Sequence, residues 1–289
     1  MTTTIFRKNN DDACIASDSR VTWVDKLSNL PTKWFDSTDF LKTLSIDDVM
    51  YGFAGTNVMF KLFLHNYTSR EESEFVLDTL VQLAKQNQVQ FFIIRYDGAE
   101  LKLFAYSPPH PDDPNSPEIC RFSKDPAIDK GIYAIGSGKF SKEFKKHRTN
   151  KNAQVPIRKI ITANQLGLKK ARMLDLEQKV ASGTLSLEES KQAYLACKSK
   201  GGDLFTGGEV KMTKNATRQQ IEEQVAILDR MDQQAKASGA VCASPVNASL
   251  EVKQLNSLGQ YAVSPNAIDA SEKRSILFNK MQEALRLSI

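Results

Sequence analysis

Alternation of apolar and polar residues predicts β-strands along much of the chain. The first residues alternate as a strand, residues 9–12 supply turn-forming Asn and Asp, and residues 13–17 resume an extended apolar pattern. A hairpin is therefore predicted at the start. Asp97-Gly98 favours a type I′ turn in a second hairpin. The further predicted strands are 21–24, 43–46, 49–53, 91–96, 101–106, 132–135 and 209–213.

Apolar residues at helical spacing predict helices between and after these strands. Met59, Phe60, Phe63 and Leu64 fall on one face of a helix, as do the apolar residues of 75–84. The other predicted helices occupy much of 139–200, the segment that opens with a capping box at Thr217 and Gln220, and the end of the chain from about residue 269.

This mixture of strands and helices predicts an α+β protein in two parts. Residues 1–215 contain the predicted strands, so we assign them to one domain. Residues 216–289 have a different character, with two helices around a segment of small and polar residues, and form a mostly helical C-terminal extension. Whether the extension packs on the core or bridges subunits is left open.

The composition of the chain limits which compartment and which kinds of functional site are expected. The chain has 289 residues and a net charge of +5, and no apolar run is long enough for a membrane span. Neither a membrane segment nor a signal peptide is predicted, so we expect a cytoplasmic protein. Its cysteines are far apart and it has three histidines, which predicts no disulfide framework, metal site or cofactor. The cysteines are Cys14, Cys120, Cys197 and Cys242.

Basic residues concentrate in one stretch, residues 139–172, where Glu143 is the only acid. A nucleic-acid footprint is one reading of such a stretch. Because aromatic residues that could stack on bases are few there, we favour a solvated helix face or an oligomer surface. Nucleic acid is therefore not an expected partner.

The start of the chain offers a nucleophile. Cleavage after Met1 would leave Thr2 with a free α-amine, and the hydroxyl of an N-terminal threonine can attack a carbonyl while the amine accepts its proton. Many proteins begin Met-Thr for no chemical reason. The rest of the chain must therefore decide between these interpretations.

Several short segments in the same order resemble the proteasome β-subunit family, which includes the simpler bacterial peptidase that works beside a ring ATPase. They extend over about the first 215 residues. The matching positions are Thr2, Asp18 in Ser17-Asp18-Ser19-Arg20, Lys42 in Lys42-Thr43-Leu44-Ser45-Ile46-Asp47, Gly55 in Gly52-Phe53-Ala54-Gly55, Ser137 in Gly136-Ser137-Gly138, and Asp203 with Thr206-Gly207-Gly208. Threonine replaces the family's serine at Thr206.

The resemblance implies a role for each position. Thr2 would attack a peptide carbonyl to form an acyl-enzyme. Lys42, oriented by Asp18, would stabilise the negative charge that develops on the hydroxyl oxygen of Thr2. The backbone amide of Gly55 would face the oxyanion. The remaining catalytic candidates, which would hold the α-amine in place, are Ser137, Asp203 and Thr206.

Simpler explanations exist for four of these residues. Asp18 could pair with Arg20 or cap a turn, and Lys42 could be a solvated lysine at a strand edge. Ser137 could belong to a tight turn with no other role. Phe53 occupies a position that lines the substrate pocket in the family, but it could equally be a core aromatic.

The resemblance also implies a fold and an activity. The fold would be a four-layer αββα Ntn-hydrolase sandwich of two antiparallel sheets, and the activity would be threonine-type hydrolysis of peptide bonds. The expected partners are a peptide or unfolded protein as substrate, other copies of the chain in a homo-oligomeric ring, and a ring ATPase unfoldase. The alternatives are a small-molecule amidohydrolase with the same fold and a non-catalytic, proteasome-like assembly or interaction protein.

Overall fold

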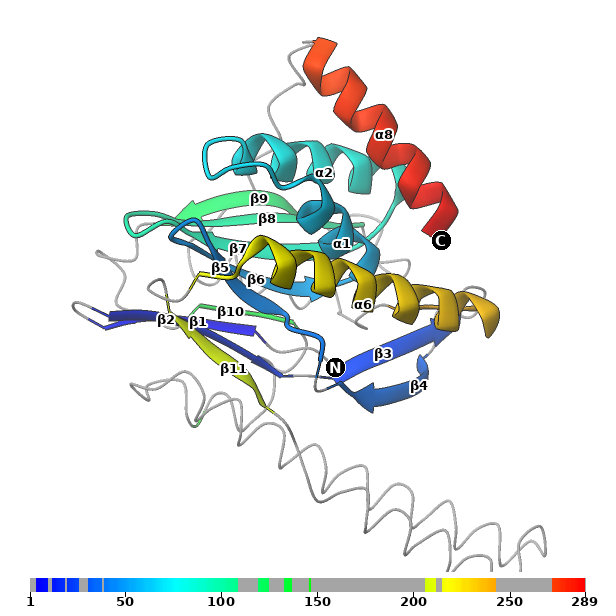
Figure 1. The fold of residues 1–289 in the computed structure, drawn as a ribbon, viewed down its shortest axis with the longest axis horizontal. Helices are drawn as coiled ribbons and strands as arrows, with labels where there is room; N and C mark the ends of the chain where they lie inside the picture. The colour runs from blue at the N-terminus through cyan, green and yellow to red at the C-terminus, as the bar shows by residue number, and fades with distance from the viewer. Residues whose placement is uncertain are drawn as a thin grey trace, which may run out of the picture.

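The described residues of the chain fold into stacked antiparallel sheets, with their helices on one side (Figure 1). The observations come from a computed structural model. It describes residues 4–9, 12–18, 20–25, 31–37, 39–108, 119–124, 133–136, 146, 206–211, 215–242 and 272–288. The predicted helices within 139–200, including the basic stretch of 139–172, lie almost wholly outside these residues.

One sheet, the N-terminal sheet, is built around the first hairpin. Its strand order is β10-β1-β2-β11. Asn9 pairs with Asp12 across the turn, which confirms the hairpin predicted there. The strands are β1 (Thr4–Asn9), β2 (Asp12–Asp18), β10 (Tyr133–Ile135) and β11 (Thr206–Lys211).

A second sheet, the central sheet, has the order β5-β6-β7-β8-β9. The strands predicted at 43–46 and 49–53 are confirmed, and they pair around a turn at Asp47 and Asp48, because both residues have positive φ (49° and 58°) and Ile46 pairs with Val49. Asp and Asn tolerate this conformation better than most side chains. The strands are β5 (Thr43–Ile46), β6 (Val49–Gly55), β7 (Phe91–Tyr96), β8 (Leu101–Ser107) and β9 (Ile119–Lys124).

The predicted hairpin of β7 and β8 is confirmed, but its connection is longer than a two-residue type I′ turn. Tyr96 pairs with Leu101, which leaves a four-residue loop. The Asp97 carboxylate accepts hydrogen bonds from the backbone N–H groups of Ala99 (3.1 Å) and Glu100 (2.8 Å). An aspartate that satisfies two loop amides favours this wider loop over the tight turn.

Apolar residues divide the central sheet into two faces. Met50 and Ala54 of β6 pack with Phe6 and Ile15 of the N-terminal sheet, so the two sheets share a core. On the other face, alternate residues of β6 such as Tyr51 pack under α1 (Asn57–Asn66) and α2 (Ser73–Asn87). The described residues thus form a helix layer over two sheets. The fourth, helical layer of the predicted sandwich falls on residues that are not described.

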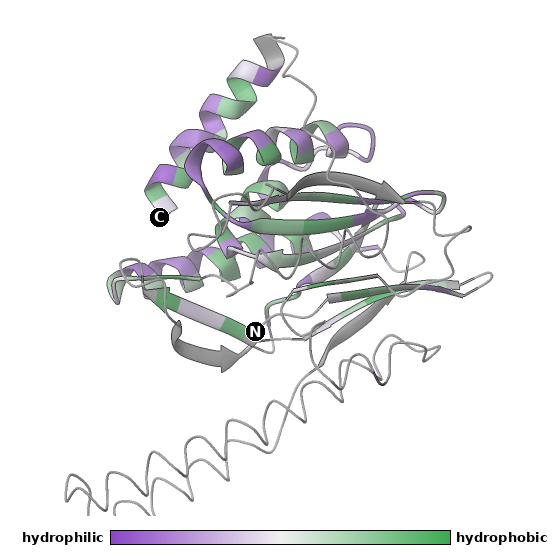
Figure 2. Cartoon of the chain, turned by 180° about the vertical axis from the view of Figure 1, so that it is seen from behind, coloured by the Kyte–Doolittle hydropathy of each residue, from purple (hydrophilic) through white to green (hydrophobic). Residues whose placement is uncertain are grey.

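The predicted C-terminal helices pack on this helix layer. They are α6 (Arg218–Ala237) and α8 (Glu272–Ser288), and buried residues of both, such as Leu228 and Leu285, join the core under α1 and α2. The predicted capping box of Thr217 and Gln220 is present at the start of α6. Figure 2 shows these helices as alternating hydrophobic and hydrophilic stripes, as expected for one buried face. Of the two alternatives for the extension, packing on the core accounts for both helices.

A third, small sheet pairs one strand of the C-terminal part with two strands of the N-terminal part. Its order is β12-β3-β4, with β12 (Ala240–Cys242), β3 (Arg20–Asp25) and β4 (Pro31–Asp36). The strand β3 was predicted, whereas β4 was missed because its sequence has no clear alternation and begins with proline. Pro31 suits the first position of a strand at a sheet edge.

A buried charge cluster connects α1 to α6. Lys61 Nζ lies 2.9 Å from Asp229 Oδ1 and 3.3 Å from Asp232 Oδ2, and it donates to Ser288 Oγ of α8 at 2.8 Å. Burial raises the pKa of Asp232 to about 6, and the attraction of Lys61 only partly offsets this effect. The folded state therefore binds a proton at Asp232 more readily than the unfolded chain does.

This shift predicts a pH dependence of stability. Because the pKa of Asp232 is about 6 in the folded state against 3.8 for an ordinary aspartate, the free energy of unfolding should fall as pH rises from about 4 to about 6. At 1.36 kcal/mol for each pKa unit, the whole shift corresponds to about 3 kcal/mol, and most of it is lost over this pH range. Urea unfolding at several pH values should show a flatter dependence for Asp232→Asn than for the parent. Equal slopes for Asp232→Asn and the parent would contradict the assignment.

Candidate functional site

The strand that follows the predicted nucleophile is held against the central sheet by Thr4. Thr4 is fully buried, and its Oγ1 donates a hydrogen bond to the carbonyl oxygen of Phe53 at 2.8 Å. The contact joins β1 to β6, residues that are 49 positions apart in the sequence. The start of β1 is therefore fixed next to the end of β6.

The backbone of Lys42 contacts the main chain of the same residue, Phe53. The backbone N–H of Phe53 donates to the carbonyl oxygen of Lys42 at 2.8 Å. Lys42 is 2% exposed, so the alternative of a solvated lysine at a strand edge is wrong. Lysine is almost never fully buried unless it is paired or functional. The main chain of Phe53 thus connects the N-terminal strand to a buried lysine.

Helix α6 fixes the segment that leads to Lys42. The side-chain amide of Gln224 accepts a hydrogen bond from the Leu41 N–H at 2.8 Å and donates one to the Asp39 carbonyl at 2.9 Å. Gln224 is itself buried. A contact that spans more than 180 residues therefore holds the backbone beside Lys42, and sequence analysis gave no sign of it.

Gly55 ends β6 two residues after Phe53, in a conformation that requires glycine. Its φ is 120°, and a Cβ atom would lie 2.6 Å from the Cα of Phe91 and 2.9 Å from the carbonyl oxygen of Gln90. Helix α1 begins at Asn57, so the partial positive charge of its N-terminus lies close by. A developing negative charge would be favoured here. The oxyanion role of Gly55 itself stays a prediction.

Strand register brings two more predicted positions to this end of the N-terminal sheet. Thr4 pairs with Ser17, and Asp18, the next residue of β2, pairs with Thr206 at the start of β11. On its other edge Thr4 pairs with Ile135 of β10, two residues before Ser137. Asp18 and Thr206 therefore lie at the same end of this sheet as Thr4.

The predicted site residues differ in how far the structure places them. Lys42 and Gly55 are placed with their surroundings, and Asp18 and Thr206 are placed by strand register alone. Thr2, Ser137 and Asp203 lie outside the described residues. The catalytic roles of all seven residues stay predictions.

The ring of Phe53 packs away from the N-terminal sheet. It stacks on Phe60 of α1 with ring centroids 4.8 Å apart and an interplanar angle of 9°, and it belongs to the core under the helices. This packing accounts for the ring as a core aromatic. The substrate-pocket role of Phe53 stays a prediction, whereas its backbone has a place in the site that sequence analysis missed.

Two other residues of the site were also missed. Gly52 lies beneath Thr4, because a Cβ atom on it would be 2.7 Å from Thr4 Cγ2. Asn57, at the first position of α1, is buried, and its Nδ2 has no hydrogen-bond partner among the described residues. For this part of the site, the only sequence signal was a polar Thr4 at the start of a predicted strand. Gly52 and Asn57 gave none.

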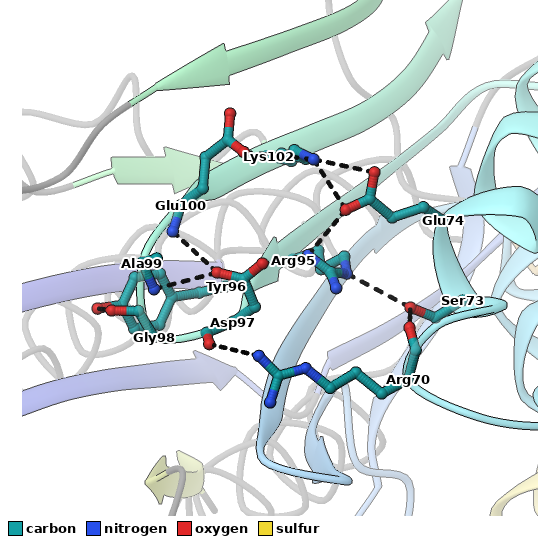
Figure 3. Close-up of polar contacts among 10 residues, drawn as sticks. All are labelled: Arg70, Ser73, Glu74, Arg95, Tyr96, Asp97, Gly98, Ala99, Glu100 and Lys102. Carbon is teal, nitrogen blue, oxygen red and sulfur yellow. Dashed lines mark hydrogen bonds and ion pairs between the residues drawn. The ribbon is translucent and has the colours of Figure 1, made fainter.

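A second polar cluster lies at the opposite end of the central sheet (Figure 3). Arg95 is buried, with Nη1 2.8 Å from Asp97 Oδ2 and 3.0 Å from Glu74 Oε1, and Lys102 Nζ lies 2.8 Å from the same Glu74 oxygen. Burial alone would raise the pKa of Asp97, but the Glu100 N–H and Arg95 lower it to about 2. Each of these charged groups already has a partner of opposite sign. The cluster therefore fastens α2 to the β7–β8 loop and offers no unpaired charge to a ligand.

The described residues contain no candidate metal cluster, no disulfide and no membrane-spanning helix. Within them no group of three or more His, Cys, Asp or Glu side chains could hold a metal ion. Cys14 and Cys242 are buried, and neither forms a disulfide among the described residues. Among the helices in the described ranges, none has the length and apolar character needed to cross a membrane.

Comparisons with known proteins leave the family open. No protein-family model matches the chain, and neither does any curated protein. Among solved structures, the chain is similar to the crystal structure of eukaryotic HslV from Trypanosoma brucei. The identity is 20% and the TM-score 0.34, over 56% of this chain and 91% of that one. A TM-score this low does not establish a shared fold.

Proposed function

We propose that the protein is a threonine-type peptidase with Thr2 as its nucleophile, exposed by cleavage after Met1. The observation that carries the proposal is the double contact at the Phe53 main chain. Its carbonyl binds Thr4 of the N-terminal strand and its N–H binds the carbonyl of the buried Lys42, two residues before Gly55. Nucleophile strand, lysine and oxyanion glycine are thereby joined through one residue.

The chemistry follows from these neighbours. The hydroxyl of Thr2 attacks the peptide carbonyl, and its proton passes to the α-amine. The peptide C–N bond then breaks, and the departing amine takes this proton and leaves an acyl-enzyme ester on Thr2. The Lys42 side chain stabilises the negative charge on the attacking oxygen, an effect that is stronger in a buried site than in water. The positive-φ backbone at Gly55 and the start of α1 stabilise the oxyanion. Water then hydrolyses the acyl-enzyme.

The rest of the site and the assembly have proposed roles as well. Asp18 orients Lys42, and Ser137, Asp203 and Thr206 hold the α-amine. The enzyme works as a homo-oligomeric ring on peptides or unfolded protein in the cytoplasm, with a ring ATPase as its unfoldase. Native mass spectrometry of the purified protein should give a multiple of the chain mass rather than a 32.3 kDa monomer.

A threonine-directed electrophile, such as an epoxyketone, tests the chemistry. Intact mass should show loss of Met1 and one adduct, and peptide mapping should place the adduct on Thr2. Lys42→Met, which keeps the length of the buried side chain but removes its charge, should slow adduct formation at least about 100-fold because the oxygen loses its electrostatic stabilisation. Retention of Met1, or an adduct on another residue, would overturn the proposal.

A further inference from the structure

We propose that Thr4 is a positioning residue, which sets the distance between the strand of the nucleophile and the strand that leads to Gly55. The inference rests on the function proposed above. Thr4 touches no reacting atom in this proposal. It acts through its hydroxyl on Phe53 and through its methyl group on Gly52.

The hydroxyl sets the approach of the two strands. Thr4 Oγ1 donates to the Phe53 carbonyl at 2.8 Å in a fully buried position, where a hydrogen bond has little competition from water. The same Phe53 binds the Lys42 carbonyl through its N–H at 2.8 Å. A change in the Thr4 hydrogen bond would therefore alter the placement of β1 relative to Lys42.

The methyl group sets the depth of contact. Thr4 Cγ2 occupies the space that a side chain at position 52 would need, since a Cβ on Gly52 would lie 2.7 Å from it and 3.1 Å from Ile15 Cγ2. Threonine at position 4 and glycine at position 52 are thus complementary in shape. A larger residue at position 52 or at position 4 would push β1 away from β6.

The position of Thr4 in the chain connects this contact to the chemistry. Thr2 precedes Thr4 by two residues, the interval at which side chains of an extended strand return to the same face. A displacement of about 1 Å between reacting groups can lower a rate about 100-fold. A residue that fixes β1 against β6 therefore contributes to kcat rather than to substrate affinity.

The test compares substitutions that separate hydroxyl from methyl. Thr4→Val removes the hydroxyl and keeps the branch, and it should lower kcat and the rate of electrophile labelling about 10-fold or more with little change in KM. Thr4→Ser keeps the hydroxyl and should retain kcat within about threefold of the parent. Thr79→Val is the matched control. It removes an equivalent threonine hydrogen bond, from Oγ1 to the Phe75 carbonyl at 2.8 Å within α2, and should leave kcat unchanged.

A double substitution tests the shape complementarity. Gly52→Ala should lower kcat because its Cβ pushes Thr4 away, and Gly52→Ala with Thr4→Ser should recover most of the loss because Cγ2 is gone. Parent-like kcat in Thr4→Val, or no recovery in the double variant, would overturn the positioning role while the proposed function stood. A parent protein without labelling or turnover would overturn the proposed function, and this inference with it.

Discussion

Replacement of Thr2 by alanine should lower peptide turnover at least about 1000-fold. The α-amine that accepts the proton remains in this variant, but the oxygen that forms the acyl-enzyme is absent. The described residues should fold as in the parent, because the contact that fixes the start of β1 comes from Thr4. Steady-state hydrolysis of a fluorogenic peptide, together with a urea unfolding curve, measures both outcomes.

Two variants serve as controls for this result. Thr2→Ser retains a hydroxyl and an α-amine and should keep measurable turnover and labelling. Thr3→Ala leaves the nucleophile in place and should lower turnover far less than Thr2→Ala. Turnover in Thr2→Ala that equals the parent would place the chemistry elsewhere and favour a non-catalytic role for this end of the sheet.

Replacement of Gly55 by alanine should destabilise the fold by at least about 3 kcal/mol. Two independent effects contribute. The φ of 120° is unfavourable for any residue with a Cβ, and that Cβ would lie 2.6 Å from the Cα of Phe91. Because the clash is with backbone of the neighbouring strand, rotation of a side chain cannot relieve it. The free energy of unfolding from urea denaturation measures the loss.

Gly239→Ala provides the matched control. Gly239 also has positive φ, at 70°, but a Cβ there would meet nothing within 4 Å. Its replacement should therefore cost about 1 kcal/mol, the conformational penalty alone. The difference between the two variants measures the close approach of β6 and β7 at Gly55 together with its less favourable φ. Equal losses would show that this approach is looser than the structure indicates.

Local signals in the sequence predicted much of the secondary structure. The β5–β6 pair around Asp47 and Asp48, helices α1 and α2, and the capped start of α6 were all found from short-range patterns. Such patterns succeed because turn chemistry and amphipathic spacing act within a few residues. They failed at β4, which lacks alternation, and at the β7–β8 loop, where the Asp97 carboxylate binds two loop amides.

The candidate site was predicted only in part. Lys42 and Gly55 were proposed from the sequence, and the structure adds that the lysine is buried and that the glycine has a backbone no other residue adopts easily. Thr4, Gly52 and Gln224 were not identified. Each acts through a partner at least 48 residues away in the sequence, and no local pattern reports such a pairing.

The sequence by itself determined which residue types this protein has available for chemistry, and the order of most of its strands and helices along the chain. Periodicity, turn residues and caps depend on neighbours along the chain, so they can be read without a fold. Only the tertiary structure decided that Thr4 and Lys42 meet on the main chain of Phe53. That contact depends on how two sheets stack and on the space left by Gly52, which are properties of packing between distant segments rather than of any one segment.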